Sequence, residues 1–394
     1  MFLCINLYIL AHVTLLTTCV YLQVIKSGIG DSAKAEVMHC LINILQQREV
    51  KDQVITSGGV EAFIKHLQSG SNTLIQLAAI ALYILSSVKA YAEVICAKGA
   101  LAALVIVLQS KVESEVLVEV VKALGELCDG NANRQSMLNS TPGGIRSLCS
   151  TLQGCDDADL LLALCQCMTK IAENHPTNQN SIVDCGGACD VIMLAEIKNR
   201  DIQLAAVDTI HMLAKSNPFT QAKLVEDGVI GPLINLLNKS KSQVVQEKTA
   251  GALWSLAGDD GEERRKMAVT MGVNLLIDFL GSLSEILHFI GCEGLGVLAH
   301  GAHNYQDAIA QANGVHPLVR LLKSEKEYLV LSAIRSIRHL CIGVGYLPHP
   351  SNQNTVSQAR GIKLLVALMI LSSNELIQVE SALTLSCVAL GMSF

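Results

Sequence analysis

A short glycine-centred signature recurs along this chain of 394 residues and constrains its fold more than any other feature. The marker glycines, separated by 40 to 47 residues, are Gly59, Gly99, Gly144, Gly187, Gly228, Gly272, Gly314 and Gly361. Self-similarity with a period of about 42 residues indicates supersecondary units that stack on one another. We therefore expect a repeat array rather than one globular core.

Each marker separates a short helical segment from a longer one, as in QAKLVEDGVIGPLINLLNKS at residues 221–240. Glycine adopts positive φ without a steric penalty, so we predict that the eight markers form the sharp turn between two helices. A third, long helix follows, with Val245, Ala252 and Leu256 on one face of a representative example. Because no such unit buries its faces alone, the pattern predicts an all-α solenoid with three helices per repeat.

The composition agrees with helices and argues against a β-sandwich and against a nucleic-acid-binding protein. Apolar residues make up 51% of the chain, while aromatic residues make up only 4% and prolines number seven, which disfavours a β-sandwich. The net charge of −6 is spread without a basic stripe, so nucleic acid is not an expected partner. The fourteen cysteines are scattered through apolar helical patterns, and we expect reduced, buried thiols.

Two segments carry a specific resemblance. The sequences ALWSLAGD at 252–259 and VHPLVRLLKS at 315–324 fit the frame of a short helix ending in GG or GV followed by two longer helices. In this frame the chain resembles the armadillo-repeat family over essentially everything after residue 20. The resemblance implies a right-handed superhelical solenoid whose third helices line a concave groove that binds partner proteins.

The ends of the array are atypical. We predict a truncated N-terminal repeat at 1–48, with an apolar leader at 1–25, followed at 49–394 by about eight armadillo units, the last one truncated. Thr17 and Thr18 stand where the first glycine turn is expected. The apolar ends suggest a fragment or short isoform of a longer array with further repeats.

The leader has a second interpretation. Residues 1–25 contain no Asp, Glu, Lys or Arg and are long enough to span a bilayer as a helix. The edge of a repeat explains the same pattern, and we prefer it. A membrane anchor remains the alternative.

The third helices supply the candidate binding residues. In the importin-like members an Asn in each third helix holds the ligand backbone, but here only Asn43 matches that position. Trp254 is expected to pack in the framework, since a lone Trp on a periodic helix is usually core. The predicted groove is of mixed charge and is formed by Asn43, Lys122, Glu126, Asp208, Lys248, Ser255, Glu293, Arg335 and His339. Such a groove would select an acidic and apolar segment, and a merely solvated polar face is the alternative.

No catalytic constellation is found in the sequence. The glycines of GLGVLAHG at 294–301 fit close helix packing rather than a phosphate loop. A zinc site is suggested by the histidines at 288, 300, 303, 316 and 339, but their spacing matches no compact ligand pattern, so we predict no metal and no cofactor. Cys165 and Cys167 offer only a weak case for a thiol or metal enzyme, since alternate residues on a helix point to different faces.

These observations lead to one functional expectation and one alternative. We expect a non-catalytic protein–protein interaction scaffold in the cytoplasm or nucleus. The alternative is a membrane-tethered adaptor anchored through residues 1–25. The long connection at 343–361, with Pro348 and Pro350, is a second candidate contact surface because inserted loops in solenoids often carry binding sites.

Overall fold

The fold is entirely helical. The structure is a computed structural model that describes residues 2–391, with side chains described from residue 14 onward. Within that range it contains 26 α-helices, one short 3-10 helix and a single bridge between Ile342 and Pro348. The predicted all-α solenoid class is confirmed.

The chain forms two compact units, one ending at Leu213 and one beginning at Ala214. The N-terminal unit starts with α1 (Phe2–Lys26) and α2 (Asp31–Ile44). Four three-helix repeats follow: α3 (Arg48–Thr56), α4 (Gly59–Leu67) and α5 (Asn72–Ser86); α6 (Lys89–Ala97), α7 (Ala100–Leu108) and α8 (Ser114–Cys128); α9 (Ala132–Ser140), α10 (Gly144–Leu152) and α11 (Ala158–Ala172); α12 (Pro176–Asp184), α13 (Gly187–Leu194) and α14 (Arg200–Ala214). We number these repeats 1 to 4.

The C-terminal unit contains repeats 5 to 8, built in the same way. Their helices are α15 (Pro218–Glu226), α16 (Ile230–Lys239) and α17 (Gln243–Ala257); α18 (Gly261–Met271), α19 (Val273–Leu280) and α20 (Glu285–Ala299); α21 (His303–Gln311), α22 (Val315–Leu321) and α23 (Glu327–Cys341); α24 (Pro350–Gln358), α25 (Gly361–Leu371) and α26 (Glu375–Ala389). The 3-10 helix η1 (Val344–Tyr346) lies between α23 and α24.

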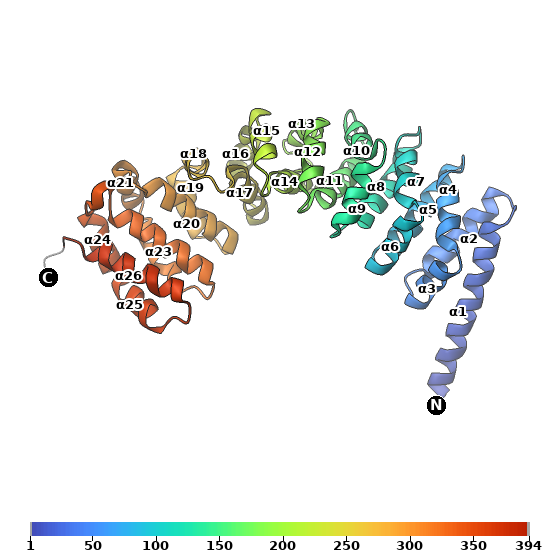
Figure 1. The fold of residues 1–394 in the computed structure, drawn as a ribbon, viewed down its shortest axis with the longest axis horizontal. Helices are drawn as coiled ribbons and strands as arrows, with labels where there is room; N and C mark the ends of the chain where they lie inside the picture. The colour runs from blue at the N-terminus through green and yellow to red at the C-terminus, as the bar shows by residue number, and fades with distance from the viewer. Residues whose placement is uncertain (1, 392–394) are drawn as a thin grey trace. The chain divides into compact units, whose positions relative to one another are not determined.

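In each unit the third helices of successive repeats pack against one another. In the N-terminal unit α5 packs on α2 and α8, and α8 packs on α11; in the C-terminal unit α17, α20, α23 and α26 pack in succession (Figure 1). Their buried faces are apolar, as at Leu82 and Leu85 in α5 and Leu124 in α8. Stacking therefore buries the apolar faces that a single repeat would leave in water.

Two details of the C-terminal repeats differ from the prediction. The last repeat, predicted to be truncated, has a third helix of 15 residues like its neighbours. The predicted long connection at 343–361 is mostly helix, because α24 occupies Pro350–Gln358 as a first helix. The true insertion is the segment at 342–349, where Val344, Tyr346 and Leu347 are exposed.

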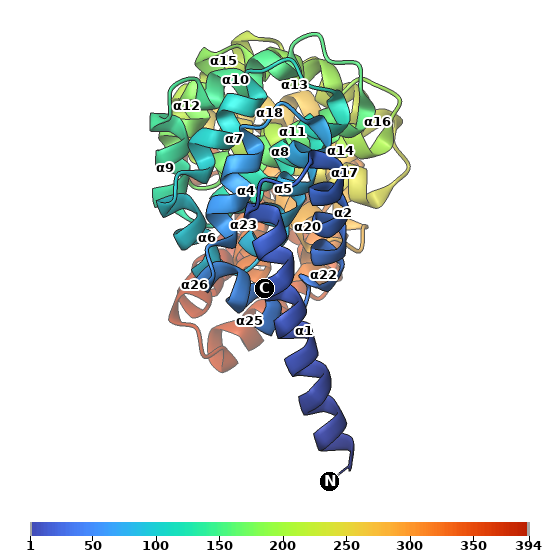
Figure 2. The same cartoon turned by 90° about the vertical axis from the view of Figure 1, so that its right-hand side faces the viewer.

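Helix α1 continues without a break through Thr17 and Thr18. Thr18, Leu22 and Ile25 are buried on one side, where α1 packs on α2, α3 and α4. Its N-terminal part projects from these helices (Figure 2), and side chains 1–13 of the predicted leader lie outside the described residues. Among the described residues no single helix is both long and apolar enough to cross a membrane, although the pair α6 and α7, bent by 75°, passes by length and composition together.

The turns between first and second helices lie at the predicted markers. At five of the eight markers, however, the residue with positive φ is not the marker glycine. Gly99, Gly228 and Gly272 do have positive φ, between 82° and 85°. For the markers Gly59, Gly144, Gly187, Gly314 and Gly361 the prediction of positive φ is wrong. There the preceding residue adopts it, at values from 60° to 81°, and these residues are Gly58, Gly143, Gly186, Asn313 and Arg360.

These five glycines are needed for space instead. A Cβ on Gly144 would lie 2.2 Å from the carbonyl oxygen of Leu138, and one on Gly361 would lie 2.6 Å from Val356 Cγ1. The second helix thus begins against the end of the first, and only glycine permits that approach. The same explanation holds for Gly294 and Gly296 of α20, as the sequence predicts: a Cβ there would meet Leu276 and Ser336 at 2.7 and 2.8 Å.

In five repeats a glutamine of the first helix hydrogen-bonds the C-terminal end of a third helix. It lies four residues after the N-cap in Gln135, Gln179, Gln221, Gln306 and Gln353. Each Nε2 donates, at 2.8 to 3.2 Å, to carbonyl oxygens at or beyond the end of third helices. A helix supplies few donors to its own last carbonyls, so the glutamine satisfies groups at these buried ends. The carbonyls of Ser255 and Ala299 also accept a backbone N–H, from Gly258 and Ala302.

Gln306 gives the sharpest test of this closure, since it is fully buried and donates to three carbonyls, those of Ala299, His339 and Ile342. Gln306→Met keeps the length but removes the donor, and we expect it to destabilise the protein by about 1–3 kcal/mol. Gln311→Met, on the exposed end of the same helix, should change stability by less than about 0.5 kcal/mol. Urea unfolding of both variants measures the difference, and equal stabilities would contradict the role of Gln306.

The space requirement at the markers has its own test. Gly361→Ala places a Cβ 2.9 Å from the carbonyl oxygen of Val356, and we expect a loss of about 1–3 kcal/mol. Gly231→Ala in α16 is the control, because no atom lies within 4 Å of its Cβ position. Helix propensity predicts that this control is neutral or stabilised by up to about 1 kcal/mol. Thermal unfolding measures both variants. Equal decreases in unfolding temperature for Gly361→Ala and Gly231→Ala would contradict the space requirement.

Candidate functional site

The predicted groove residues all lie on third helices or on α2, and the structure brings some of them together. Lys122 and Glu126 are one turn apart on α8, whereas Asn43 is exposed on α2. Asp208 on α14 is half-buried, as are Lys248 and Ser255 on α17. Three others gather around one pocket in the C-terminal unit: Glu293 on α20, and Arg335 and His339 on α23.

In the N-terminal unit the charged side chains pair with one another. Glu126 accepts from Lys170 of α11 at 2.6 Å, and Lys170 also lies 3.7 Å from Asp129. Lys122 pairs with Glu119 of its own helix at 2.9 Å. Pairs at this degree of exposure contribute little stability, so their main effect is to leave an ordered polar surface along α8 and α11.

The C-terminal unit has a similar row of contacts across three third helices. Glu293 accepts a hydrogen bond from Ser332 of α23 at 2.7 Å and lies 3.8 Å from Arg264. Arg335 donates to Glu380 of α26 at 2.9 Å, and Arg338 also pairs with that carboxylate. Burial raises the pKa of Glu380, but the hydrogen bonds from the two arginines outweigh it and hold the pKa below its usual value.

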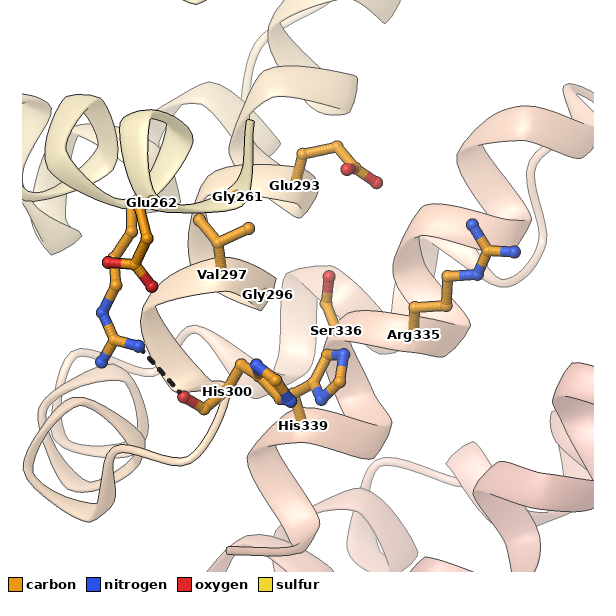
Figure 3. A pocket seen from close by; sticks show the side chains of 10 residues that line it. Gly261, Glu262, Glu293, Gly296, Val297, His300, Arg335, Ser336 and His339 are labelled. Carbon is orange, nitrogen blue, oxygen red and sulfur yellow. Dashed lines mark hydrogen bonds between the residues drawn. The ribbon is translucent and has the colours of Figure 1, made fainter. Parts of the chain in front are cut away.

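A pocket of about 230 Å³ opens beside this row, between α20, α23 and the start of α18 (Figure 3). Glu293, Arg335 and His339 contribute to its lining, and Val297 gives it an apolar patch. On one side Arg265 donates to the carbonyl oxygen of His300 at 3.3 Å. The pocket therefore offers both signs of charge and an apolar surface within one hollow of third helices.

His339 is held neutral in this pocket. Burial lowers its pKa to about 4, helped by the neighbouring His300 and Arg338. The His300 and His339 rings meet edge to face with centroids 4.5 Å apart. At neutral pH the imidazole is therefore uncharged, and one ring nitrogen donates while the other accepts.

Trp254 is a packing residue, as expected from the sequence. It is 7% exposed, and the guanidinium of Arg264 lies 5.7 Å from the ring centroid. Trp254 forms part of the wall of a second hollow of about 850 Å³, which runs along α15, α17 and the start of α18. This hollow includes the predicted Ser255.

The thiols do not have the properties of catalytic nucleophiles. None of the described cysteines forms a disulfide. Burial raises the pKa of both Cys165 and Cys167 to about 12, so their thiolate forms are scarce at neutral pH. This disfavours the thiol-enzyme hypothesis.

Sequence reasoning missed several residues of the site. Glu380, Arg264 and Ser332 hold the predicted residues in place, while His300 and Arg265 complete the pocket. Glu380 and Ser332 lie on third helices, one turn before the aligned groove positions, and a search of the adjacent turn could have found them. Arg264 and Arg265 come from the first helix α18, which the groove frame does not include.

Comparison with known proteins agrees with the fold. Residues 221–258 and 303–342, which cover repeats 5 and 7, match the family model Armadillo/beta-catenin-like repeat. A crystal structure of an engineered protein superposes with a TM-score of 0.81 at 24% identity, covering 95% of this chain and 89% of that one. A designed armadillo repeat protein superposes with a TM-score of 0.52 at 20% identity, over 62% of this chain and 99% of that one. Repeats 5 and 7 thus match the armadillo-repeat family, and the expected resemblance of the chain to that family is confirmed.

Among natural relatives, the chain is similar to the ankyrin and armadillo repeat-containing protein, as the sequence predicts. A match to the C-terminal armadillo region of that protein stays a prediction. The Mus musculus protein is 34% identical over 131 residues, which cover 33% of this chain and 9% of that protein. Vacuolar protein 8 of Schizosaccharomyces pombe is 31% identical over 173 residues, covering 42% of this chain and 31% of that protein. The chain thus spans less than a third of the length of either relative.

The neutral state of His339 predicts a pH effect on stability. Its folded pKa of about 4 lies below the usual 6.5, so the unfolded chain binds the extra proton first. The contribution is constant above pH 6.5, and stability falls by up to roughly 3 kcal/mol as the pH drops toward 4. The denaturant concentration at the midpoint of unfolding should therefore decrease less between pH 7 and pH 5 in His339→Gln than in the wild type. The same change at the exposed His316 should not alter that loss, and identical profiles for the wild type and His339→Gln would contradict the account.

Proposed function

We propose that this chain is a non-catalytic scaffold that binds a partner protein through the surface formed by α20, α23 and α26. An armadillo-repeat solenoid fits a protein-interaction role. The observation that carries the finer proposal is the pocket whose lining includes Glu293, Arg335 and His339 (Figure 3). We call this surface, with its pocket, the third-helix site.

The chemistry of the third-helix site selects its ligand. Arg335 is 44% exposed and donates through Nε to Glu380, while its guanidinium carries further N–H donors. These donors suit a carboxylate or a backbone carbonyl of a partner segment. Val297 suits an apolar side chain, and the neutral His339 suits a backbone amide. The proposed ligand is therefore an extended or helical protein segment with acidic and apolar side chains.

The proposal of a non-catalytic role rests on two observations. The sequence has no phosphate loop, nucleophile elbow or HExxH pair, and burial suppresses the thiolates of Cys165 and Cys167. In the third-helix site Arg335 pairs with Glu380, and the Ser332 hydroxyl that donates to Glu293 is buried, whereas a nucleophile has to be open to its substrate. We place this scaffold in the cytoplasm or nucleus, as the sequence predicts.

A membrane-tethered adaptor is the alternative, and the exposed Leu16 and Val20 of the leader are compatible with it. Thr18, Leu22 and Ile25 of the leader are committed to packing against repeat 1. Alkaline carbonate extraction of cell membranes tests the alternative directly. Full-length protein that remains in the membrane pellet would support the anchor, and complete release would eliminate it.

The third-helix site is tested by affinity purification of partners from cells with Glu293→Gln combined with Arg335→Ala. Glu380 keeps Arg338 as its partner in this variant, so the fold should persist. We expect the double variant to recover at least tenfold less of a partner that the wild type retains. A tenfold weaker affinity corresponds to about 1.4 kcal/mol of binding free energy. Lys323→Ala is the matched control, an exposed cation outside the pocket lining.

Circular dichroism must first show that both variants are folded. A partner set that is unchanged in the double variant would place binding elsewhere and overturn the third-helix site. Equal loss in the Lys323→Ala control would indicate a general effect of charge and would also contradict the proposal.

A further inference from the structure

Three potential metal ligands meet where repeat 7 joins repeat 8. His303 begins α21, Asp307 lies one turn later on the same helix, and His349 is the N-cap of α24. The donor atoms of all three lie within 4.8 Å of one another. His303 Nδ1 is 3.2 Å from Asp307 Oδ2, and His349 Nε2 is 3.0 Å from Asp307 Oδ1.

The fold fixes one ligand and leaves the others accessible. His349 is buried, and its Nδ1 accepts the backbone N–H of Asn352 at 3.3 Å, which sets the orientation of the ring. Asn352 in turn donates to the carbonyl oxygens of Leu340 and Gln306, and this ties α24 to repeat 7. His303 and Asp307 are exposed, so an ion and its water molecules can reach them.

We propose that His303, Asp307 and His349 bind one zinc ion. Two imidazole nitrogens and a carboxylate oxygen form a donor set suited to zinc, with bonds of about 2.0–2.2 Å and an open position for water. His303 Nδ1 and His349 Nε2 already lie beside the Asp307 carboxylate, at 3.2 Å from Oδ2 and 3.0 Å from Oδ1. Ligands of one tetrahedral zinc ion are about 3.3 Å apart, so small rotations of the exposed His303 and Asp307 side chains would bring the three donors, now within 4.8 Å, onto one ion. Magnesium and calcium prefer oxygen donors and fit this site poorly. The proposed ion would link two successive repeats.

The histidine cap occurs twice in the chain, but only one copy has the other ligands. The sequences HPTNQ at 175–179 and HPSNQ at 349–353 form the same N-cap with the same following proline. At the first, the partner of His175 Nε2 is the hydroxyl of Ser136 at 2.8 Å and not a carboxylate. At the second, Nε2 meets Asp307 with His303 beside it, the two rings having centroids 4.7 Å apart. The donor set is therefore specific to the second copy.

The hydrogen bond that His349 makes as a helix cap limits the expected affinity for zinc. Because Nδ1 of His349 accepts a hydrogen bond, the proton of the neutral ring sits on Nε2 and points to Asp307. When zinc takes Nε2, a neutral ring carries its proton on Nδ1, where it opposes the cap. Binding therefore competes with one capping hydrogen bond, and we expect moderate rather than picomolar affinity.

Calorimetric titration of the reduced full-length protein with zinc chloride tests the site. The exchange His349→Asn removes the ligand but keeps a good cap, since Asn217 caps α15 before Pro218 in the same way. We expect one zinc ion per wild-type chain and at least a tenfold weaker affinity in His349→Asn and His303→Ala. The matched control His175→Asn should bind as the wild type does, and excess magnesium should not compete.

The result that would overturn the proposal is equally direct. Wild-type protein that takes up no zinc in the titration has no such site. Uptake that is unchanged in both His349→Asn and His303→Ala would place the ion elsewhere, for example on the exposed thiols of Cys40 and Cys189. Neither outcome affects the third-helix site, which contains none of these three residues.

Discussion

The constraint on which the rest of the structure depends is the capping of buried third-helix ends by side chains from first helices, which is found in five of the eight repeats. An α-helix leaves its last carbonyl groups without partners, and in a solenoid many of these ends are buried. Gln135, Gln179, Gln221, Gln306 and Gln353 supply the donors in five repeats. Each bond fixes a first helix against the end of a third helix, and Gln221 and Gln306 also bond the third helix of the preceding repeat.

Much of this architecture can be predicted from periodicity, because the marker glycines and the apolar faces repeat with the structural unit. The local roles are harder to predict. Glycine serves two needs at the same turn: positive φ at Gly99 but space at Gly361. A single sequence does not separate them, since the left-handed position can also be taken by Arg360. The glutamines recur at the same position in five of the eight repeats, but a polar residue in a first helix suggests a solvated face until its burial is known.

The candidate site could be predicted only in part. Glu293, Arg335 and His339 share a phase on successive third helices, and this phase brings them to one pocket. Their partners follow no such rule, because Arg264 comes from a first helix and Glu380 from another turn. Of the three proposed zinc ligands only His303 stood among the candidate histidines of the sequence. Asp307 and His349 were missed because they are 42 residues apart and the ring of His349 is oriented by a helix cap.

The central claim, that a partner segment lies in the pocket between α20 and α23, is tested most directly by site-specific photo-crosslinking in cells. A photoreactive amino acid replaces Val297, which lines the pocket, and in a separate protein replaces the exposed Phe219 on α15. The account predicts a discrete crosslinked protein from position 297 that is absent from position 219. The same crosslinks from both positions, or none from position 297 while a partner still co-purifies, would contradict it.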